Sequence, residues 1–120
     1  MGNFQELTVW QKAKELAVHI YKLTNQGKLA NDYSLKDQIR RAAISIPSNI
    51  AEGDELDTDK QSIRHFYYAK GSTAELLTQS LISFDIGYID KKTYEDIEKE
   101  CKIISSMLMR LIQARSKPKP

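Results

Sequence analysis

Residues Arg40–Gly53 read RRAAISIPSNIAEG, and this stretch decides how the rest of the chain is interpreted. Its apolar residues recur at helical spacing on both sides of Pro47. Proline inside a helix lacks the amide donor and clashes with the carbonyl four residues earlier, at a cost of about 3 kcal/mol. The stretch therefore predicts a core helix that kinks at Pro47 and continues.

Helical periodicity extends to the rest of the chain. The first expected helix spans about residues 7–25, and Gly27 suits its end. The second follows Ser34, whose hydroxyl would cap it with Asp37 as the capping-box partner. Its predicted buried stripe is Leu35, Ile39, Ala42, Ala43, Ile46 and Ile50.

Two further helices follow. The third is expected to begin at Asp57 or Thr58 and to end at Gly87. The fourth is expected from after Asp90 to about Ala114, with apolar residues alternately three and four positions apart. The predicted buried residues of the third helix are Ile63, Phe66, Tyr67, Ala74, Leu77, Leu81 and Phe84.

These helices and their short loops predict the fold class. No run of residues is typical of a strand, and long amphipathic helices with short connections favour a bundle. We expect an all-α, antiparallel up-down four-helix bundle with a proline-kinked second helix. It would form one domain, residues 1–115, followed by a disordered basic tail, residues 116–120.

Composition excludes several classes of protein. The 120 residues are 41% hydrophobic and 28% charged, as in ordinary globular domains. Cys101 is the only cysteine, so neither an internal disulfide nor a cysteine-based zinc site is expected. No secretory signal or long apolar run is present, which predicts a cytoplasmic protein.

The basic residues are concentrated at the end of the chain. The net charge is +2, yet no acidic residue follows Glu100. Such a run is either a nucleic-acid contact or a solvated tail. The candidate contacts to RNA or DNA are Arg110, Arg115, Lys117 and Lys119, with Arg40 if it faces outward.

Residues for catalysis or metal binding are not found in the expected patterns. Glu15 and His19 do not form the Glu-x-x-His pairs of di-iron bundles, and the acidic stretch after Gly53 lacks the glycine and glutamate of a calcium loop. Cys101 falls on the apolar seam of the fourth helix, where a buried hydrophobic role is expected. We therefore expect no enzymatic activity, no metal and no cofactor.

A second polar face on two of the helices predicts a packing and assembly motif. Gly71, in the middle of a helix, is expected to allow a close approach by Ser45 or Ser48. Arg41 and Glu75 would then pair across this seam. The full motif comprises Arg41, Ser45, Pro47, Ser48, Asn49, Glu52, Gly53, Gly71, Ser72 and Glu75.

Several segments resemble one family. The run QIRRAAISIPSNIAEG (Gln38–Gly53) is similar to the signature of the 23S rRNA intervening-sequence proteins, and FQELTVWQKAKELA, AKGSTAELLTQ and IGYI are similar to other parts of that family. The chain departs from the family in the loop GKLANDYS and in the acidic DELDTD, where family members often have a basic residue.

The resemblance implies an assembly more than a reaction. Family members are bacterial four-helix bundles that associate as homopentamers, and no catalytic residues are known among them. A similar protein, the accessory variability determinant of diversity-generating retroelements, binds nucleic acid and works with a reverse transcriptase. The resemblance thus implies a homopentamer that binds RNA or DNA. The alternatives are a scaffold that binds only protein, such as a reverse transcriptase, and a monomeric enzyme.

Overall fold

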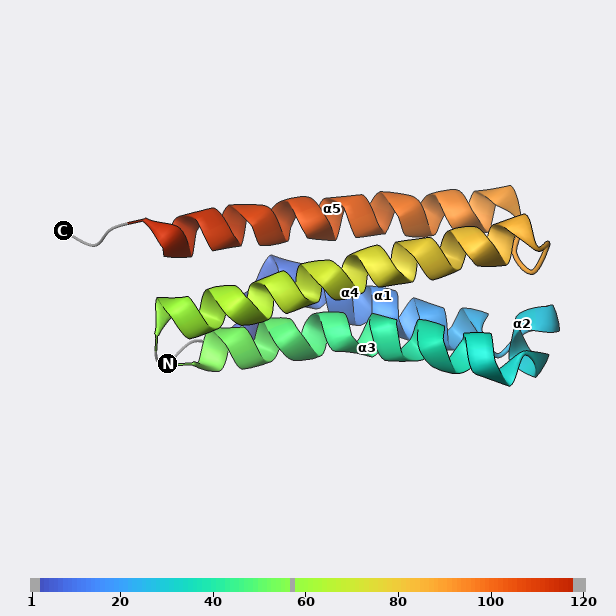
Figure 1. Ribbon diagram of the computed structural model, residues 1–120, viewed down its shortest axis with the longest axis horizontal. Helices are drawn as coiled ribbons and strands as arrows, with labels where there is room; N and C mark the ends of the chain where they lie inside the picture. Colours follow the sequence, from blue (N-terminus) through green and yellow to red (C-terminus); the bar gives the residue numbers. More distant parts are fainter. Residues whose placement is uncertain (1–2, 57, 118–120) are drawn as a thin grey trace.

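The computed structural model describes residues 3–56 and 58–117, and all regular structure within them is helical. Four long helices lie side by side along an elongated molecule with extents of 54 × 21 × 19 Å (Figure 1). The predicted all-α class is confirmed. The elements are η1 (Phe4–Glu6), α1 (Thr8–Leu23), α2 (Gly27–Asn31), α3 (Tyr33–Glu55), α4 (Asp59–Asp85) and α5 (Lys91–Ser116).

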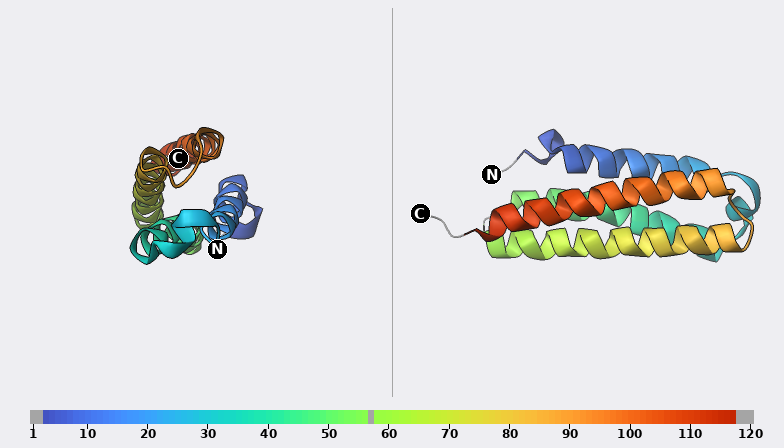
Figure 2. Two further views of the ribbon diagram at one scale, coloured as in Figure 1. Left: turned by 90° about the vertical axis from the view of Figure 1, so that its right-hand side faces the viewer. Right: turned by 90° about the horizontal axis from the view of Figure 1, so that it is seen from above.

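The long helices form a bundle in which chain neighbours are also neighbours in space. The colours of Figure 1 show that the chain reverses direction from α1 to α3, from α3 to α4 and from α4 to α5. Seen end-on, α1, α3, α4 and α5 follow one another around the bundle, and α5 also contacts α1 (Figure 2). The bundle therefore presents α1 with α3 on one side and the outer surface of α4 on another.

The predicted apolar stripes of the first, second and fourth helices lie in the core. Ile39, Ile46 and Ile50 of α3 are at most 2% exposed, on the stripe expected from their spacing. Side chains from all four long helices complete the core. The other largest fully buried apolar residues are Ile20, Leu29, Phe66, Leu76, Ile97, Ile104 and Leu108.

The prediction for α4 is only partly confirmed: Phe66 is fully buried and Ile63 and Leu77 pack against the core, but Ala74 is exposed. Tyr67 and Leu81 were expected in the core but are 49% and 42% exposed. The buried face of α4 instead carries many small hydroxyl residues. The hydroxyls of Thr73, Ser80 and Ser83 donate to the carbonyl four residues earlier, as from Ser80 Oγ to Leu76 O at 2.7 Å. Hydrophobicity alone cannot identify such a face. The buried polar residues of α4 are Ser62, Ser72, Thr73, Ser80 and Ser83.

The start of α3 also differs from the prediction. Its cap is Asp32 rather than Ser34, because the Leu35 amide donates to Asp32 Oδ1 at 3.1 Å. The preceding residues, expected to form a loop, contain α2, which begins at Gly27 with a φ of 60°.

The predicted caps of the later helices are confirmed where the structure describes them. Thr58 Oγ1 accepts from the Gln61 amide at 3.3 Å, whereas Asp57 lies outside the described residues. Asp90 Oδ1 accepts from the Thr93 amide at 2.8 Å. Gly87 follows α4 with a φ of 81°. Helix α5 continues to Ser116, and the last part of the expected tail, residues 118–120, lies outside the described residues.

Candidate functional site

A hydrogen-bonded seam joins α3 to α4 within the Gln38–Gly53 stretch. Ser72 Oγ donates to Ser45 Oγ at 2.8 Å, and the Asn49 amide donates to the same oxygen at 3.0 Å. His65 Nδ1 lies 3.1 Å from Asn49 Oδ1, and because that oxygen can only accept, the imidazole donates. Glu52 Oε2 lies 3.7 Å from the same nitrogen. Ser45, Asn49, Glu52 and Ser72 of the predicted packing motif therefore all take part in this contact between α3 and α4.

Asn49 also contacts the backbone near Pro47. Its amide donates to Ser45 O at 2.9 Å, so it does not replace the missing amide partner of the Ala43 carbonyl. Helix α3 continues through Pro47 to Glu55.

The close approach between α3 and α4 involves Gly53, not Gly71. A Cβ at Gly53 would lie 2.8 Å from the ring of the fully buried Phe66, whereas a Cβ at Gly71 would have nothing within 4 Å. The predicted packing of Gly71 against Ser45 or Ser48 is therefore wrong. Gly71 lies on the outer surface because its neighbour Ser72 takes the inward position.

The predicted pair between Arg41 and Glu75 is also absent. Both residues are exposed, and the described residues contain no ion pair between them. Each lies on the outward side of its own helix, since Ala42 and Leu76 take the buried positions beside them. One subunit leaves both charges facing solvent.

Two of the candidate nucleic-acid contacts bind within the chain. Arg40 donates to Thr24 Oγ1 at 2.7 Å and to Asn25 Oδ1 at 2.8 Å, and its guanidinium lies 4.4 Å from the centre of the Tyr21 ring. These contacts fasten the end of α1 to α3.

Arg115 closes the other end of the bundle. It donates to Asp54 Oδ1 at 2.9 Å, and the Asp54 side chain is only 5% exposed. The guanidinium also lies 5.5 Å from the Phe66 ring. Arg115 thus compensates a buried carboxylate rather than presenting a free charge.

The remaining candidates differ in their surroundings. Arg110 and Lys117 are exposed, and Arg110 borders a shallow hollow of about 350 Å³ between α1 and α5. Lys119 lies outside the described residues. The exposed part of the predicted basic surface is therefore on the C-terminal half of α5.

The described residues offer little reactive chemistry. They contain no group of three or more His, Cys, Asp or Glu side chains able to hold a metal ion. Cys101 is 1% exposed, and burial, with a smaller effect of Glu100, raises the pKa of its thiol to about 12. At neutral pH this thiol stays protonated, so it is a poor nucleophile.

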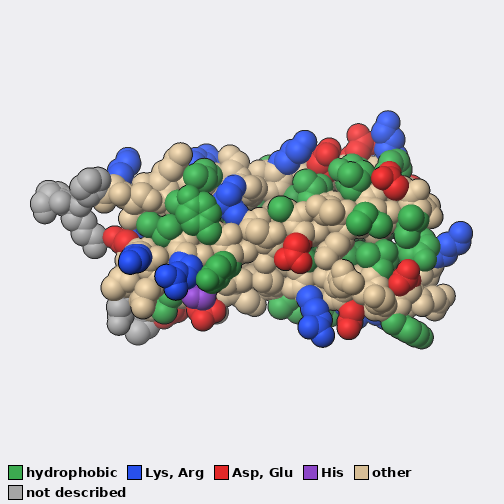
Figure 3. All heavy atoms as spheres, viewed as in Figure 1, with side chains coloured by type: hydrophobic (Ala, Val, Ile, Leu, Met, Phe, Trp, Pro, Cys, Tyr) green, Lys and Arg blue, Asp and Glu red, His purple; other side chains and the backbone are tan. Residues whose placement is uncertain are grey.

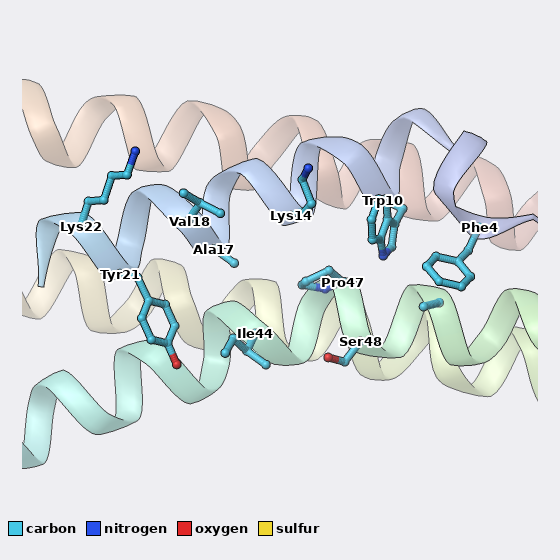
Figure 4. A pocket seen from close by; sticks show the side chains of 11 residues that line it. Phe4, Trp10, Lys14, Ala17, Val18, Tyr21, Lys22, Ile44, Pro47 and Ser48 are labelled. Carbon is cyan, nitrogen blue, oxygen red and sulfur yellow. The ribbon is translucent and has the colours of Figure 1, made fainter.

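An apolar groove opens between α1 and α3, which we call the α1–α3 groove (Figure 4). Its volume is about 680 Å³, and Pro47 and Ser48 form its α3 side, facing Trp10. The apolar side chains Val18 and Ile44 are 47% and 45% exposed. The groove residues used below are Trp10, Val18, Tyr21, Ile44, Pro47 and Ser48.

The outer surface of α4 is a second apolar face, which we call the α4 ridge. Its large side chains are about half exposed, including Tyr68 at 52%, Ile82 at 45% and Ile86 at 51%. Figure 3 looks onto this side of the molecule, where hydrophobic side chains gather toward both ends. Together with Gly71 and Glu75 they are spaced three, four or seven residues apart, which places all five on one line along the helix. The ridge residues used below are Tyr68, Gly71, Glu75, Ile82 and Ile86.

Neither face was predicted from the sequence, although a signal was present. Val18 and Ile44 fall outside the apolar stripes of their helices, as do Ile82 and Ile86 on α4 once its true buried face is known. Apolar residues left over after the core is assigned are informative where they form contiguous patches, because such patches mark interaction surfaces.

Comparison with known proteins identifies the family of this chain. The sequence model described as 23S rRNA-intervening sequence protein matches residues 5–110. The chain belongs to this family. A solved protein of unknown function from the S23 ribosomal protein family of Bacteroides thetaiotaomicron is 25% identical, with a TM-score of 0.77. The match covers 88% of this chain and 98% of that one, while a search of proteins with curated descriptions found no match.

The family assignment agrees with the helical bundle and with the resemblance seen in the Gln38–Gly53 stretch. Among the described helices, none has both the length and the apolar character needed to cross a membrane.

Proposed function

We propose that this chain is a non-enzymatic, cytoplasmic bacterial protein that assembles as a homopentamer and binds RNA or DNA. The proposed assembly is supported mainly by two apolar faces that one subunit leaves uncovered, the α1–α3 groove and the α4 ridge. Monomeric proteins rarely leave large contiguous apolar surfaces in water. Neighbouring copies in an assembly would cover both faces.

The nucleic-acid part of the proposal rests on α5. Arg110 and Lys117 are exposed, and the sequence has no acidic residue after Glu100 to offset them, whereas the exposed Lys102 lies 3.6 Å from Glu98 Oε2. Arg40 and Arg115 drop out as primary contacts because their donors are occupied within the chain. Assembly would repeat this basic surface in every subunit, which raises the avidity of a patch that is weak alone.

The proposal also includes the direction of the helices and a bend in α3 at Pro47. We take the four long helices as an antiparallel up-down bundle in which Pro47 bends α3, because proline removes one helix hydrogen bond and its ring crowds the preceding turn. Pro47 also lines the α1–α3 groove, so the bend would shape the surface used for assembly. Pro47→Ala should then weaken self-association without lowering the stability of the subunit.

Binding of a labelled rRNA-like hairpin, titrated at rising salt, tests the nucleic-acid part. Arg110→Gln and Lys117→Gln should weaken binding and reduce the salt slope by about 0.7–0.9 for each phosphate that the variant no longer neutralises. These substitutions are preferable to truncation after Ala114, which would remove Arg115 and leave Asp54 without its partner. Lys92→Gln, at the opposite end of α5 and paired with Asp96, is the matched control.

The competing function is a scaffold that binds protein alone, for example a reverse transcriptase. The apolar character of the two faces favours protein contacts as such. An assembled protein that fails to bind the hairpin even at low salt would exclude the nucleic-acid proposal and leave the scaffold.

A further inference from the structure

The two uncovered faces of the subunit are unlike each other. The α1–α3 groove is concave, with the small residues Pro47, Ser48 and Ala51 along its α3 side. The α4 ridge is the surface of one helix, and a Cβ at Gly71 in its middle would have nothing within 4 Å. They face different sides of the bundle (Figure 2).

We propose that the α4 ridge of one copy packs lengthwise into the α1–α3 groove of the next copy, with the two bundles parallel. This inference rests on the proposed self-association and names its interface. Each subunit would then use its groove toward one neighbour and its ridge toward the other. Such a contact between unlike faces closes into a ring when the rotation between copies allows it.

Hydrogen bonds within one subunit show which residues of neighbouring helices lie at the same position along the bundle axis, which we call the same height. Ser72 contacts Ser45, so these residues of α4 and α3 lie at the same level. Arg40 contacts Thr24, which aligns α3 with α1 in the same way. Because antiparallel helices share the same rise per residue, Glu75 lies level with Ala42 of α3 and close to the level of Lys22 of α1.

This alignment makes the charges of the two faces complementary. A neighbour placed alongside at the same height would bring its Glu75 to the level of Lys22 and Arg41, both of which are exposed. Toward the other end, its Arg64 would lie near Glu55, which continues the groove line of α3 one turn beyond Ala51. Parallel packing at this height therefore opposes Glu75 to Lys22 and Arg41 and opposes Arg64 to Glu55, while Lys14 in the groove falls near the level of Tyr68.

Reversing the neighbour would remove this match. An antiparallel ridge in the same groove would bring Arg64 toward Lys22 and Arg41, and Glu75 toward Glu55. Like charges placed opposite each other cost free energy and select against that orientation. Packing ridge against ridge or groove against groove would satisfy charges in an antiparallel pair. It would leave the groove of about 680 Å³ unfilled.

Two variants test the pairing of unlike faces. Ile44→Arg places a cation in the groove, and Ile82→Arg places one on the ridge; both side chains are 45% exposed, so the subunit should still fold. Each variant alone should be monomeric by light scattering, with an unchanged helical circular dichroism spectrum. Tyr33→Arg, at a side chain that is 75% exposed and lines neither face, should assemble like the wild type.

The deciding experiment is an equimolar mixture of the two variants. The Ile44→Arg chain keeps an intact ridge and the Ile82→Arg chain keeps an intact groove, so one of each should join as a heterodimer that cannot grow further. If the mixture stays monomeric, or if one variant assembles alone, this interface is wrong, but the proposal that the chain self-associates is unaffected. A wild-type chain that is itself monomeric would overturn both the assembly and its interface.

Discussion

At the scale of single residues, Arg115 is needed because Asp54 is buried. The Asp54 side chain is 5% exposed, its Oδ1 accepts from Arg115, and its Oδ2 has no hydrogen-bond partner. Removing one partner of a buried pair leaves a desolvated charge, which is costly. The sequence alone presented Arg115 as a free cation, because the partner is far away in the chain.

Arg115→Gln should therefore lower the free energy of unfolding by about 2–3 kcal/mol, less than the loss for a fully buried pair because the Arg115 side chain is 29% exposed. Urea unfolding measures the change. Adding Asp54→Asn should recover part of the loss, and Arg110→Gln, an exposed neighbour on α5, should change stability by no more than about 0.5 kcal/mol. An equal effect of Arg115→Gln and Arg110→Gln would contradict this role.

Gly53, in the last turn of α3, and Gly71, in the middle of α4, form a matched pair of predictions. Gly53→Ala should destabilise the protein by about 1–3 kcal/mol, since the new Cβ would lie 2.8 Å from the buried Phe66 ring. Gly71→Ala should instead stabilise the subunit by up to about 1 kcal/mol, because alanine is the better helix former and nothing lies within 4 Å. Thermal unfolding of both variants in the monomeric Ile44→Arg background tests the assignment, and the two changes in stability must have opposite signs.

At the scale of helices, the sequence was informative where burial coincides with hydrophobicity. Ile39, Ile46 and Ile50 of α3 follow the helical period and are buried as expected. Helix α4 has the opposite distribution, since Ser80 and Ser83 are buried while Ile82 and Ile86 are about half exposed. The hydroxyls of Ser80 and Ser83 donate to carbonyls of the same helix, so a pattern of hydrophobic residues does not reveal that these serines are buried.

The ends of helices were predicted where a local cap determines them. Thr58 and Asp90 each bond the amide three residues ahead, a pattern visible in the sequence. At α3, Ser34 was the predicted cap, whereas Asp32 is the observed one. Tyr88 donates to Asp32 Oδ2 at 3.0 Å across the bundle, and that contact is not visible from local sequence.

The cap of α5 should make stability depend on acidity. The hydrogen bonds from Thr93 to Asp90 lower the pKa of that carboxyl below its ordinary value of 3.8. Because the folded state favours the ionised form, this contribution is present above the unfolded pKa and is lost as the pH falls through the folded value. Asp90→Asn should therefore show a smaller loss of stability than the wild type between about pH 5 and pH 3. Identical acid profiles of the two proteins would exclude the effect.

At the scale of the whole molecule, the candidate site could be predicted only in part. The Gln38–Gly53 stretch identified the family, and Ser45, Asn49 and Ser72 do form a packing seam. The sequence placed Arg41 and Glu75 on the same seam, but helix rotation turns both outward. Which face of a helix is buried depends on all its neighbours at once, and for α4 those neighbours select serines over leucine and tyrosine.

Arg41 and Glu75 give the last prediction, because their coupling should depend on assembly. Within one subunit they form no ion pair, so the unfolding effects of Arg41→Ala and Glu75→Ala should add within about 0.3–0.5 kcal/mol. This cycle is measured in the monomeric Ile44→Arg background. If the ridge of one copy lies in the groove of the next, the same cycle measured on the dissociation of the ring should be non-additive by about 0.2–1 kcal/mol per interface. Non-additive effects in the monomer would show that Arg41 and Glu75 interact within one chain. Additive effects in the ring would show that they do not interact across the interface.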